Sequence, residues 1–560
     1  MKSWLEDFIS FWKNKYYAIA LSLTAVFSYG FLVTHQTVGI DDTPFAYYFE
    51  DGLAAIVGRF VLFLLNKAAH ISDFAPFLTD LAGVLIFMAA VTVWCVLLKR
   101  IFRDRIPMYG YILFGCLFLS NPLVSEVFTY YLHNGVAIGY LFSGLGLCLF
   151  WEGVNRWESK EGKGIQRRLM SVWLGSAACL WIAMGCYESF MIVYLVGVCI
   201  VLCSARMNGK VKVFAALCQA AFLAVAGIVL RSVTIVLVTK AFGLEGLRDE
   251  AVQRSVTEMA GWMFQPGAFS ELGMILKRVF VMYGVFGYAY YPIAIYVWAC
   301  GTAVIVSVWR GICRRDFWIP VLAVGGIIAS FLLVFVEGKA TLYRSAQFLP
   351  LFSAWGLLLA VYGVHLFADW VKGRQAFRTA RLVSVVMAVL LAVVVWNQCT
   401  DMNKWFYVDY LKYEDAKNTM NQIAYELEKN YDTSKPVVFT GTYQIPRSII
   451  ADAYVEYGSE TYYKMLRLTS LVDEHLLEKF NRDYGVWVAQ TPSLSVLDWG
   501  RYAFDNDEEL IRFFSMHGHE LQPLLDTDAY GPAEEYSLEL PSFPREGSIV
   551  DMGEYIIVHF

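Results

Sequence analysis

Charged residues are scarce in this sequence. Only 17% of its 560 residues are Asp, Glu, Lys or Arg, whereas 58% are hydrophobic. An ordinary soluble protein carries about 25% charged and about 45–50% apolar residues. The formal net charge of -5 gives no reason to expect a nucleic-acid partner. Most of the chain therefore needs a solvent other than water, and the composition predicts an integral membrane protein.

Cysteine is absent from the C-terminal part of the chain. No cysteine follows Cys399, and no two of the 11 cysteines form a Cys-x-x-Cys pair. Most lie inside apolar runs, as Cys95 and Cys148 do, which is typical of small packing residues rather than of disulfides or a metal site. The sequence also lacks a P-loop, a dinucleotide fingerprint and a zinc motif. No cofactor is assigned, and a divalent metal stays open without being indicated.

The N-terminus lacks the cleavage site of a signal peptide. Lys2, Lys13 and Lys15 precede an apolar run over residues 16–34, and no small-residue cleavage motif follows it. The run is also longer than the apolar core of a typical signal peptide. We therefore expect a retained first span.

Apolar runs that could cross a bilayer occur about eleven times. A transmembrane helix needs about 20 predominantly apolar residues. The predicted spans are residues 16–36, 76–98, 107–120, 135–151, 169–185, 189–205, 213–239, 279–309, 317–336, 345–370 and 382–399. The third is short and the eighth is long. The predicted fold is mainly α, a polytopic transmembrane helical bundle.

The connections between these spans alternate in charge. The N-terminal segment and the even-numbered connections hold about 22 Lys and Arg residues, against about 9 in the opposite connections. Because basic loops stay in the cytoplasm, the N-terminus is predicted to be cytoplasmic. The connections rich in carboxylates, aromatics and prolines are then external, and so is everything after the last span.

The composition changes after the last span. Residues 401–560 are charged and mixed, with a helical stretch around Tyr410–Asn430. Apolar runs at 436–439, 486–488 and 555–558 predict strands. We expect a transmembrane bundle over residues 1–400, a linking helix over 401–433 and a small extracytoplasmic α/β domain over 434–560.

Two adjacent carboxylates, Asp41 and Asp42, follow the first span. Because they repel each other, the pKa of one should rise, which suits a general base that deprotonates a sugar hydroxyl. The same pair also fits a solvated loop or an Asx turn before Pro44. The residues alone leave these alternatives open.

Residues 52–69 have the spacing of an amphipathic helix that lies in the membrane interface. Arg59 would then lie beside the membrane surface and could bind a lipid phosphate through two hydrogen bonds. The alternative is an arginine that only snorkels to the interface. Arg231, inside the seventh predicted span, is given no role and is expected to be buried against a carboxylate.

Short motifs stand in order along the predicted external side. They are Gly39-Ile40-Asp41-Asp42, Gly58-Arg59-Phe60, Asn121-Pro122 with Glu126, Tyr187-Glu188-Ser189-Phe190, Tyr343-Arg344, and the segment from Trp396-Asn397 through Tyr413-Glu414-Asp415 to Glu428. Through these motifs the chain resembles the bacterial Gtr-type O-antigen glucosyltransferases, membrane enzymes of the GT-C class. The resemblance covers most of residues 15–430.

The resemblance implies an activity. Such enzymes take a sugar from a polyprenyl-phosphate carrier and transfer it, usually with inversion, to an acceptor glycan outside the cytoplasm. An acidic residue in the first external loop acts as base or positions the acceptor, and this role carries over to Asp41 and Asp42, with Asp42 slightly preferred. The phosphate leaving group needs cations, and Arg59, Lys339 and Arg344 are the candidates. The implied location is the bacterial plasma membrane, and glucose is the default sugar of the family.

Further polar residues follow the external ends of the spans. Glu126 and Glu188 could hold acceptor hydroxyls, help to bind a metal, or pair with an arginine, because a carboxylate at a membrane boundary needs a cavity or a partner. Tyr130 and His133 could line the sugar site or belong to an interfacial aromatic belt.

Other classes of protein remain open at this point. A lipid-linked polysaccharide polymerase or ligase uses similar substrates and should carry a large arginine-rich external loop, whereas residues 241–278 are only modestly basic. A transporter or flippase of lipid-linked sugars should show inverted repeats or polar residues in mid-membrane. The ionisable residues here cluster instead at one face. A purely structural membrane component is the remaining alternative.

Overall fold

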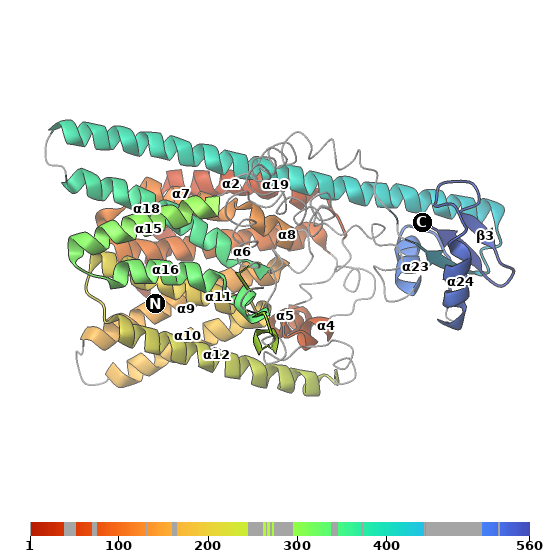
Figure 1. Ribbon diagram of the computed structural model, residues 1–560, viewed down its shortest axis with the longest axis horizontal. Coiled ribbons are helices and arrows are strands. Elements are labelled where there is room, and N and C mark those ends of the chain that lie inside the picture. The colour runs from red at the N-terminus through yellow and green to blue at the C-terminus, as the bar shows by residue number, and fades with distance from the viewer. Residues whose placement is uncertain are drawn as a thin grey trace.

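The structure is a computed structural model. It describes residues 2–38, 52–69, 75–128, 133–159, 165–244, 261–264, 266–268, 272–273, 295–337, 345–370, 374–441, 443, 507–524 and 527–560. Within these ranges the chain forms an elongated bundle of helices and, at the far end of one long helix, a small α/β domain (Figure 1). The predicted fold class, a mainly α transmembrane bundle with a small α/β domain, is confirmed.

The part of the chain before the α/β domain consists mainly of long helices that run back and forth along the long axis of the bundle, with short helices between them. In chain order they are α1 (Lys2–Lys13), α2 (Lys15–Thr34), α4 (Gly52–Ile56), α5 (Phe60–Ala69), α6 (Pro76–Phe102), η2 (Arg103–Arg105), α7 (Met108–Leu119), η3 (Pro122–Val124), α8 (Ser125–Phe128), α9 (His133–Ser159), α10 (Ile165–Cys186), α11 (Phe190–Asn208), α12 (Val213–Ala241), η5 (Gly261–Phe264), α15 (Ile295–Arg314), α16 (Trp318–Ser330), α17 (Leu332–Glu337), α18 (Phe348–Trp370) and α19 (Arg374–Asn430). Local signals start several of them. Asn14, for example, caps α2 by accepting hydrogen bonds from the backbone of Tyr16 and Tyr17.

Nine helices in the described part of the chain are long and apolar enough to cross a membrane. The two remaining predicted spans correspond to shorter apolar helices, α7 and α16. With 12 residues, α7 rises only about 18 Å, less than a bilayer core of about 30 Å. Its C-terminal half is buried among other helices, so it does not have to span the lipid by itself.

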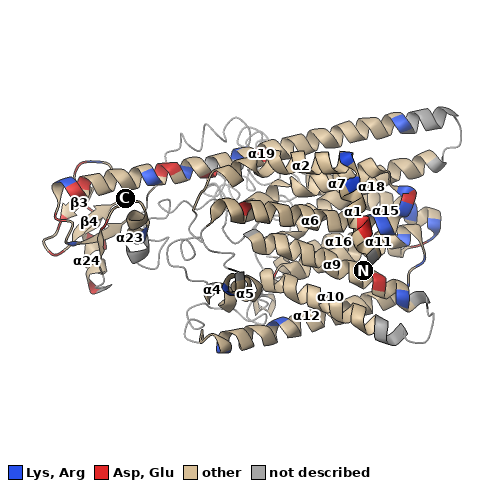
Figure 2. Cartoon of the chain, turned by 180° about the vertical axis from the view of Figure 1, so that it is seen from behind, with Lys and Arg blue, Asp and Glu red and all other residues tan. Residues whose placement is uncertain are grey.

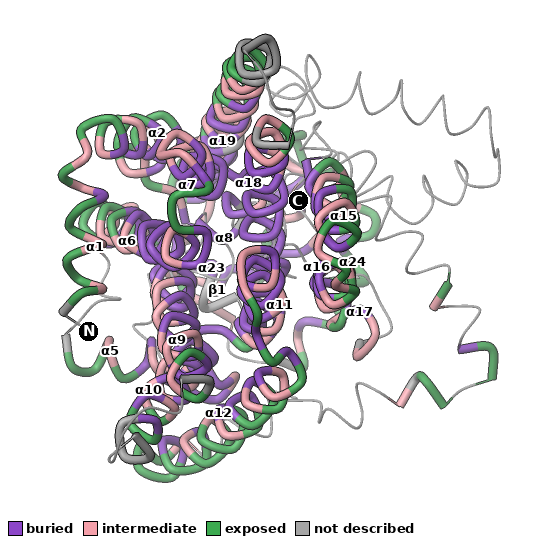
Figure 3. The backbone as a smooth tube through the Cα atoms, turned by 90° about the vertical axis from the view of Figure 1, so that its left-hand side faces the viewer, coloured by how far each residue is buried: buried purple, intermediate pink, exposed green. Residues whose placement is uncertain are grey.

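The outer faces of the bundle are apolar and exposed. Only 33% of the most apolar stretch of α12 and 17% of that of α19 is buried within the protein, against 78% for α11. Figure 3 shows the buried positions in the interior and the exposed ones on outward faces such as those of α12 and α15. Such surfaces are stable only against lipid. The protein is therefore a multi-pass membrane protein.

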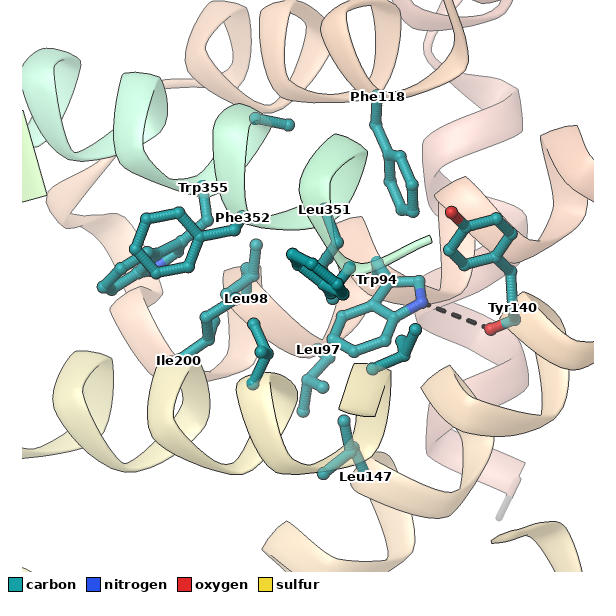
Figure 4. Close-up of a cluster of buried hydrophobic side chains, with 14 of the residues drawn as sticks. Trp94, Leu97, Leu98, Phe118, Tyr140, Leu147, Ile200, Leu351, Phe352 and Trp355 are labelled. Carbon is teal, nitrogen blue, oxygen red and sulfur yellow. Dashed lines mark hydrogen bonds between the residues drawn. The ribbon is translucent and has the colours of Figure 1, made fainter. Parts of the chain in front are cut away.

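Aromatic side chains fill the centre of the bundle between α6, α9, α11 and α18. Trp94 is fully buried, and its indole Nε1 donates a hydrogen bond to the Tyr140 carbonyl oxygen at 3.2 Å (Figure 4). Trp355 donates in the same way to Ser204 Oγ at 3.0 Å. Because each buried N–H has a partner, these large rings add apolar contact without leaving an unsatisfied polar group.

The two ends of the bundle differ in charge. Lys and Arg gather at the end away from the α/β domain, where α6 meets α7 and α15 meets α16 (Figure 2). We call this the basic end. At the opposite end, which we call the domain end, α10 meets α11 and the short helices α4, α5 and α8 lie.

The last helix, α19, continues without interruption from the membrane into the α/β domain. The domain contains α23 (Asp507–Met516), η10 (Thr527–Ala529), α24 (Tyr530–Ser537) and four strands, β1 (Pro436–Thr440), β2 (Gln522–Pro523), β3 (Ile549–Asp551) and β4 (Ile556–His559). The strand order is β2-β1-β4-β3, with β1 parallel to β2 and β4, and β3 antiparallel to β4. The strands predicted at 436–439 and 555–558 are confirmed, whereas the one at 486–488 lies outside the described residues. The domain boundaries proposed from the sequence stay predictions.

Apolar packing attaches the α/β domain to the end of α19. Met420, Ile423 and Leu427 of this helix are buried in one cluster with Phe439 of β1. The Tyr443 hydroxyl donates to Asp415 Oδ2 at 2.7 Å, which returns the chain after β1 to the same helix. The domain is therefore mounted on a continuous helix that leaves the membrane.

The prediction of one helix over residues 52–69 is wrong. The chain forms α4 and α5 instead, separated by a turn at Val57, Gly58 and Arg59. Gly58 has φ +88°, a left-handed conformation that interrupts an α-helix and favours glycine. Tertiary contacts described below explain why the break occurs at this residue.

Candidate functional site

The predicted site residues fall into three groups. Arg59 and Glu188 are fully described, and both lie at the domain end. Glu126 is in α8 and His133 is the first residue of α9, and for both the structure describes the backbone position only. The remaining predicted residues lie outside the described part of the chain; these are Asp41, Asp42, Tyr130, Lys339 and Arg344.

Arg59 lies in the turn between α4 and α5, with its guanidinium over an aromatic ring. Its Cζ atom is 4.2 Å from the centre of the Tyr187 ring. Tyr187 is buried in the connection between α10 and α11 and is 8% exposed. Such a cation–π contact contributes on the order of 1 kcal/mol and fixes the plane of the guanidinium. The Nε atom of Arg59 is buried and has no hydrogen-bond partner among the described residues.

Gly58 makes room for a second arginine. A Cβ atom at residue 58 would lie 2.1 Å from Arg231 Nη2 and 2.9 Å from its Cζ. The Gly58 backbone therefore packs directly against the Arg231 guanidinium, and any other residue would have to displace this guanidinium and adopt a left-handed φ that favours glycine. The side chain of Arg231 comes from α12 and is half-buried, and its Nε donates to the Met184 carbonyl oxygen at 3.2 Å.

Glu188 supplies the carboxylate of this group. It is exposed, next to Tyr187, and its charge acts on Arg231 together with that of Arg59. Neither guanidinium forms an ion pair of hydrogen-bond length within the part of the chain that the structure describes. Arg59, Arg231 and Glu188 thus bring two positive charges and one negative charge together. We call these three side chains the domain-end charge group.

Apolar contacts hold the α4–α5 turn in this position. Phe60 and Phe63 of α5 are buried together with Ile235 and Val238 of α12. The ring of Phe60 also lies 5.5 Å, centre to centre, from the indole of Trp181 on α10. The turn that carries Gly58 and Arg59 is therefore clamped between α10 and α12, which explains the break in the predicted helix.

A second contact links the connection between α10 and α11, which contains Glu188, to the start of α18. Ser189 Oγ donates to Gln347 Oε1 at 2.5 Å, and the Tyr140 hydroxyl donates to the Gln347 carbonyl oxygen at 2.5 Å. Gln347 is 3% exposed. It follows Arg344 by three residues in the sequence, so the described end of the segment that carries Lys339 and Arg344 is fixed beside Glu188.

The end of α2 is fixed against α19. Thr37 Oγ1 donates to Asp409 Oδ2 at 2.7 Å, and Val38 is 2% exposed in the cluster that joins α19 to the α/β domain. Asp41 and Asp42 follow Val38 by three and four residues in the sequence. The described part of this segment therefore ends at Val38, at the domain end.

A buried polar cluster precedes the helix of Glu126. Asn121 is 4% exposed, and its side chain accepts a hydrogen bond from the backbone of Leu123 at 3.1 Å. Ser120 Oγ donates to Gln398 Oε1 of α19 at 2.9 Å. These bonds fix the Asn121-Pro122 turn between α7 and α8, and with it the backbone position of Glu126.

The described residues contain no group of three or more His, Cys, Asp and Glu side chains that could hold a metal ion. An apolar cavity of about 490 Å³ lies between α1, α6, α9 and α10, lined by side chains such as Trp4, Phe8 and Cys148. It contains no charged group and lies apart from the domain-end charge group. A sugar phosphate does not match such a lining.

No role for Arg231 was predicted from the sequence. A lone charge inside an apolar span signals a partner or a function, and a carboxylate was expected beside it. The structure adds what the sequence does not contain, namely that Arg231 lies against Gly58 and near Arg59 as well as near Glu188. Two guanidiniums held near each other, with one exposed carboxylate in their vicinity, can bind an anion such as a phosphate.

Comparisons with known proteins identify a family to which the chain is similar. The family model for the glucosyl transferase GtrII matches residues 30–362. Among solved structures, the crystal structure of the Archaeoglobus fulgidus oligosaccharyltransferase in complex with Zn and sulfate is similar over 74% of this chain, with a TM-score of 0.36 and 11% sequence identity. The match spans 56% of the length of that chain. No curated protein matches the sequence.

Proposed function

The chain belongs to the GtrII family of glucosyl transferases, and we propose that it moves a hexose, with glucose as the family default, from a polyprenyl-phosphate carrier to a cell-surface glycan. The proposed reaction takes place at the domain end, on the extracytoplasmic side of a bacterial plasma membrane. The observation that carries the proposal is the domain-end charge group, in which Arg59 stacks on Tyr187 beside Arg231.

The two arginines suit the leaving group of such a reaction. When the bond between sugar and phosphate breaks, negative charge develops on the lipid phosphate and is stabilised by cations already in place. The stacking of Arg59 and the Met184 hydrogen bond of Arg231 fix their guanidiniums before any donor arrives. Lys339 and Arg344 are proposed to complete the phosphate site, and the anchoring of Gln347 beside Glu188 supports this.

The acidic pair is proposed to act on the acceptor. Asp41 or Asp42 would remove the proton of the attacking sugar hydroxyl, and the oxygen would displace the phosphate with inversion at the sugar carbon. Support comes from Val38, which is fixed at the domain end and precedes the pair by three and four residues. Glu126, Glu188, Tyr130 and His133 are proposed to hold the acceptor or the transferred sugar.

The distribution of charge supports the proposed orientation. Lys and Arg concentrate at the basic end (Figure 2), and basic connections face the cytoplasm in most membrane proteins. The N-terminus would then be cytoplasmic, and the α/β domain would lie outside, on the side of the acceptor glycan.

A transfer assay with purified protein tests the proposal. The full chain is incubated with an acceptor glycan and with each of several radiolabelled polyprenyl-phosphate sugars, and label on the glycan is measured. Transfer from one donor, and none from the matching nucleotide sugar, is the expected result. Movement of the labelled lipid across liposomes without any transfer to glycan would instead show a flippase.

A further inference from the structure

Four arginines from three separate parts of the chain meet at the basic end. Arg105 comes from η2, Arg206 from the last turn of α11, and Arg310 and Arg314 from the last turns of α15. The charges of Arg105 and Arg310 both act on the guanidinium of Arg314. Arg314 Nη1 also donates to the Arg206 carbonyl oxygen at 3.2 Å. We call these four residues the basic-end cluster.

Three of these arginines are held by hydrogen bonds or an ion pair. Arg310 Nε and Arg314 Nη1 both donate to the Met207 carbonyl oxygen, at 3.0 and 2.5 Å. Arg206 pairs with Asp316, with 2.6 Å between Nε and Oδ2. These contacts cap the C-terminus of α11, where cations are favoured by the helix dipole, and they fix the guanidiniums in place.

The fourth arginine meets the others at a tyrosine of α18. Arg105 lies close to the Tyr362 side chain, on which the charges of Arg310 and Arg314 also act. The Tyr362 hydroxyl itself donates to Asn208 Oδ1 at 3.2 Å. Guanidiniums from η2 and α15 therefore converge on one phenol from α18.

The cluster carries more positive charge than its neighbours balance. Within the described part of the chain, Asp316 is the carboxylate that pairs with it, through Arg206 alone, and Asp104 is the exposed neighbour of Arg105. Each guanidinium has five N–H donors, and the bonds formed by Arg310 and Arg314 use only a few of them. The hydrogen bonds that cap α11 explain where the guanidiniums of Arg310 and Arg314 lie. They do not balance the positive charge of these guanidiniums.

We propose that the basic-end cluster binds the head-group phosphate of an anionic phospholipid. The arginines lie where membrane-spanning helices end, which is the depth of lipid phosphates, and clusters between such helices bind anionic head groups in other membrane proteins. Guanidiniums fixed in advance match a phosphate through paired hydrogen bonds. This site lies at the opposite end of the bundle from the proposed sugar transfer and does not depend on it.

Lipid binding to the purified full chain tests this site. Native mass spectrometry in detergent would measure the apparent affinity for phosphatidylglycerol, for phosphatidylcholine and, by competition, for inorganic phosphate. We expect a preference for phosphatidylglycerol that falls about fivefold for each arginine removed, as in Arg105→Gln and in Arg310→Gln with Arg314→Gln. Arg315→Gln is the matched control, because it removes an exposed charge next to Arg314 and should keep the preference.

Three results would contradict the proposal. One is equal binding of phosphatidylglycerol and phosphatidylcholine by the wild type. Another is an unchanged preference in Arg105→Gln, a variant that leaves the cap of α11 intact and so remains informative if the double variant does not fold. A third is competition by inorganic phosphate at concentrations as low as those of the lipid, which would show a site for free phosphate.

Discussion

The Arg59 guanidinium lies over the Tyr187 ring, with Cζ 4.2 Å from its centre. This contact joins the turn between α4 and α5 to the connection between α10 and α11, two segments far apart in the sequence. Arg231 of α12 completes the arrangement against Gly58. A change in any of these residues should therefore disturb a site built from three parts of the chain.

Replacing Arg59 should impair use of the lipid-linked donor. We expect Arg59→Ala to lower kcat/KM for a polyprenyl-phosphate sugar about 100-fold, because a cation on the leaving phosphate is lost. Arg59→Lys should recover only part of this, since an ammonium cannot make the paired hydrogen bonds of a guanidinium. The measurement is transfer of labelled sugar at several donor concentrations.

The control for Arg59 is Lys67→Ala. Lys67 lies on α5 and is an exposed cation a few residues away. If both substitutions lower transfer equally, the effect comes from net charge at the domain end, and the assignment of Arg59 to the phosphate is wrong.

Gly58→Ala should disturb the site more than the same substitution at Gly243, another glycine in a left-handed conformation. Gly243 also has a positive φ, +69°, but a Cβ there meets nothing within 4 Å. Gly243→Ala should therefore cost about 1 kcal/mol from backbone strain alone, whereas Gly58→Ala also displaces Arg231. Transfer activity and thermal unfolding of both variants, compared in parallel, decide whether the difference exists.

Arg231 and Glu188 should be energetically coupled. Removing either charge with Arg231→Gln or Glu188→Gln alters the electrostatic field that the other experiences. In a double-mutant cycle on kcat/KM for the donor, we expect a coupling of about 1 kcal/mol. Additive effects would mean that Glu188 acts on the acceptor independently of Arg231.

The α/β domain should lose stability in mild acid. Burial lowers the pKa of His559, which contacts Thr440 Oγ1 through Nδ1 at 3.0 Å. Because the unfolded chain then binds a proton more readily than the folded one, the free energy of unfolding falls as pH drops through the usual histidine pKa of about 6.5. After correction for the intrinsic pH dependence of amide exchange, the protection of the amides in β1 and β4 should fall between about pH 7.5 and 5.5.

The variant His559→Gln checks this assignment. It should reduce the difference in exchange between the two pH values, whereas His517→Gln in the same domain should leave it as in the wild type. An equal difference in all three proteins would assign the pH dependence to other groups.

Much of the fold could be predicted from the sequence because the membrane imposes a simple pattern. Runs of apolar residues mark the spans, and the strands at 436–439 and 555–558 are apolar segments in a charged background. The break at Gly58 could not be predicted, since helical spacing continues across it. It results from packing against α10 and α12, in particular against the side chain of Arg231.

The candidate site was only partly predictable for a similar reason. Arg59 and Glu188 stand beside predicted spans, where a charged residue can be recognised from the sequence as a candidate site residue. Arg231 lies in the middle of an apolar run, and its neighbours come from other helices. The basic-end cluster could not be predicted for the same reason, because Arg105, Arg206 and Arg310 come together only after the chain has folded.

The most direct test of the proposed reaction is sugar transfer by the purified full chain with the acidic pair intact and removed. Label from a polyprenyl-phosphate sugar should reach the acceptor glycan with the wild type. Transfer should fall about 100-fold or more when Asp41→Asn and Asp42→Asn are combined, with the same amount of folded protein, because the general base is lost. Unchanged transfer by the double variant would contradict the account.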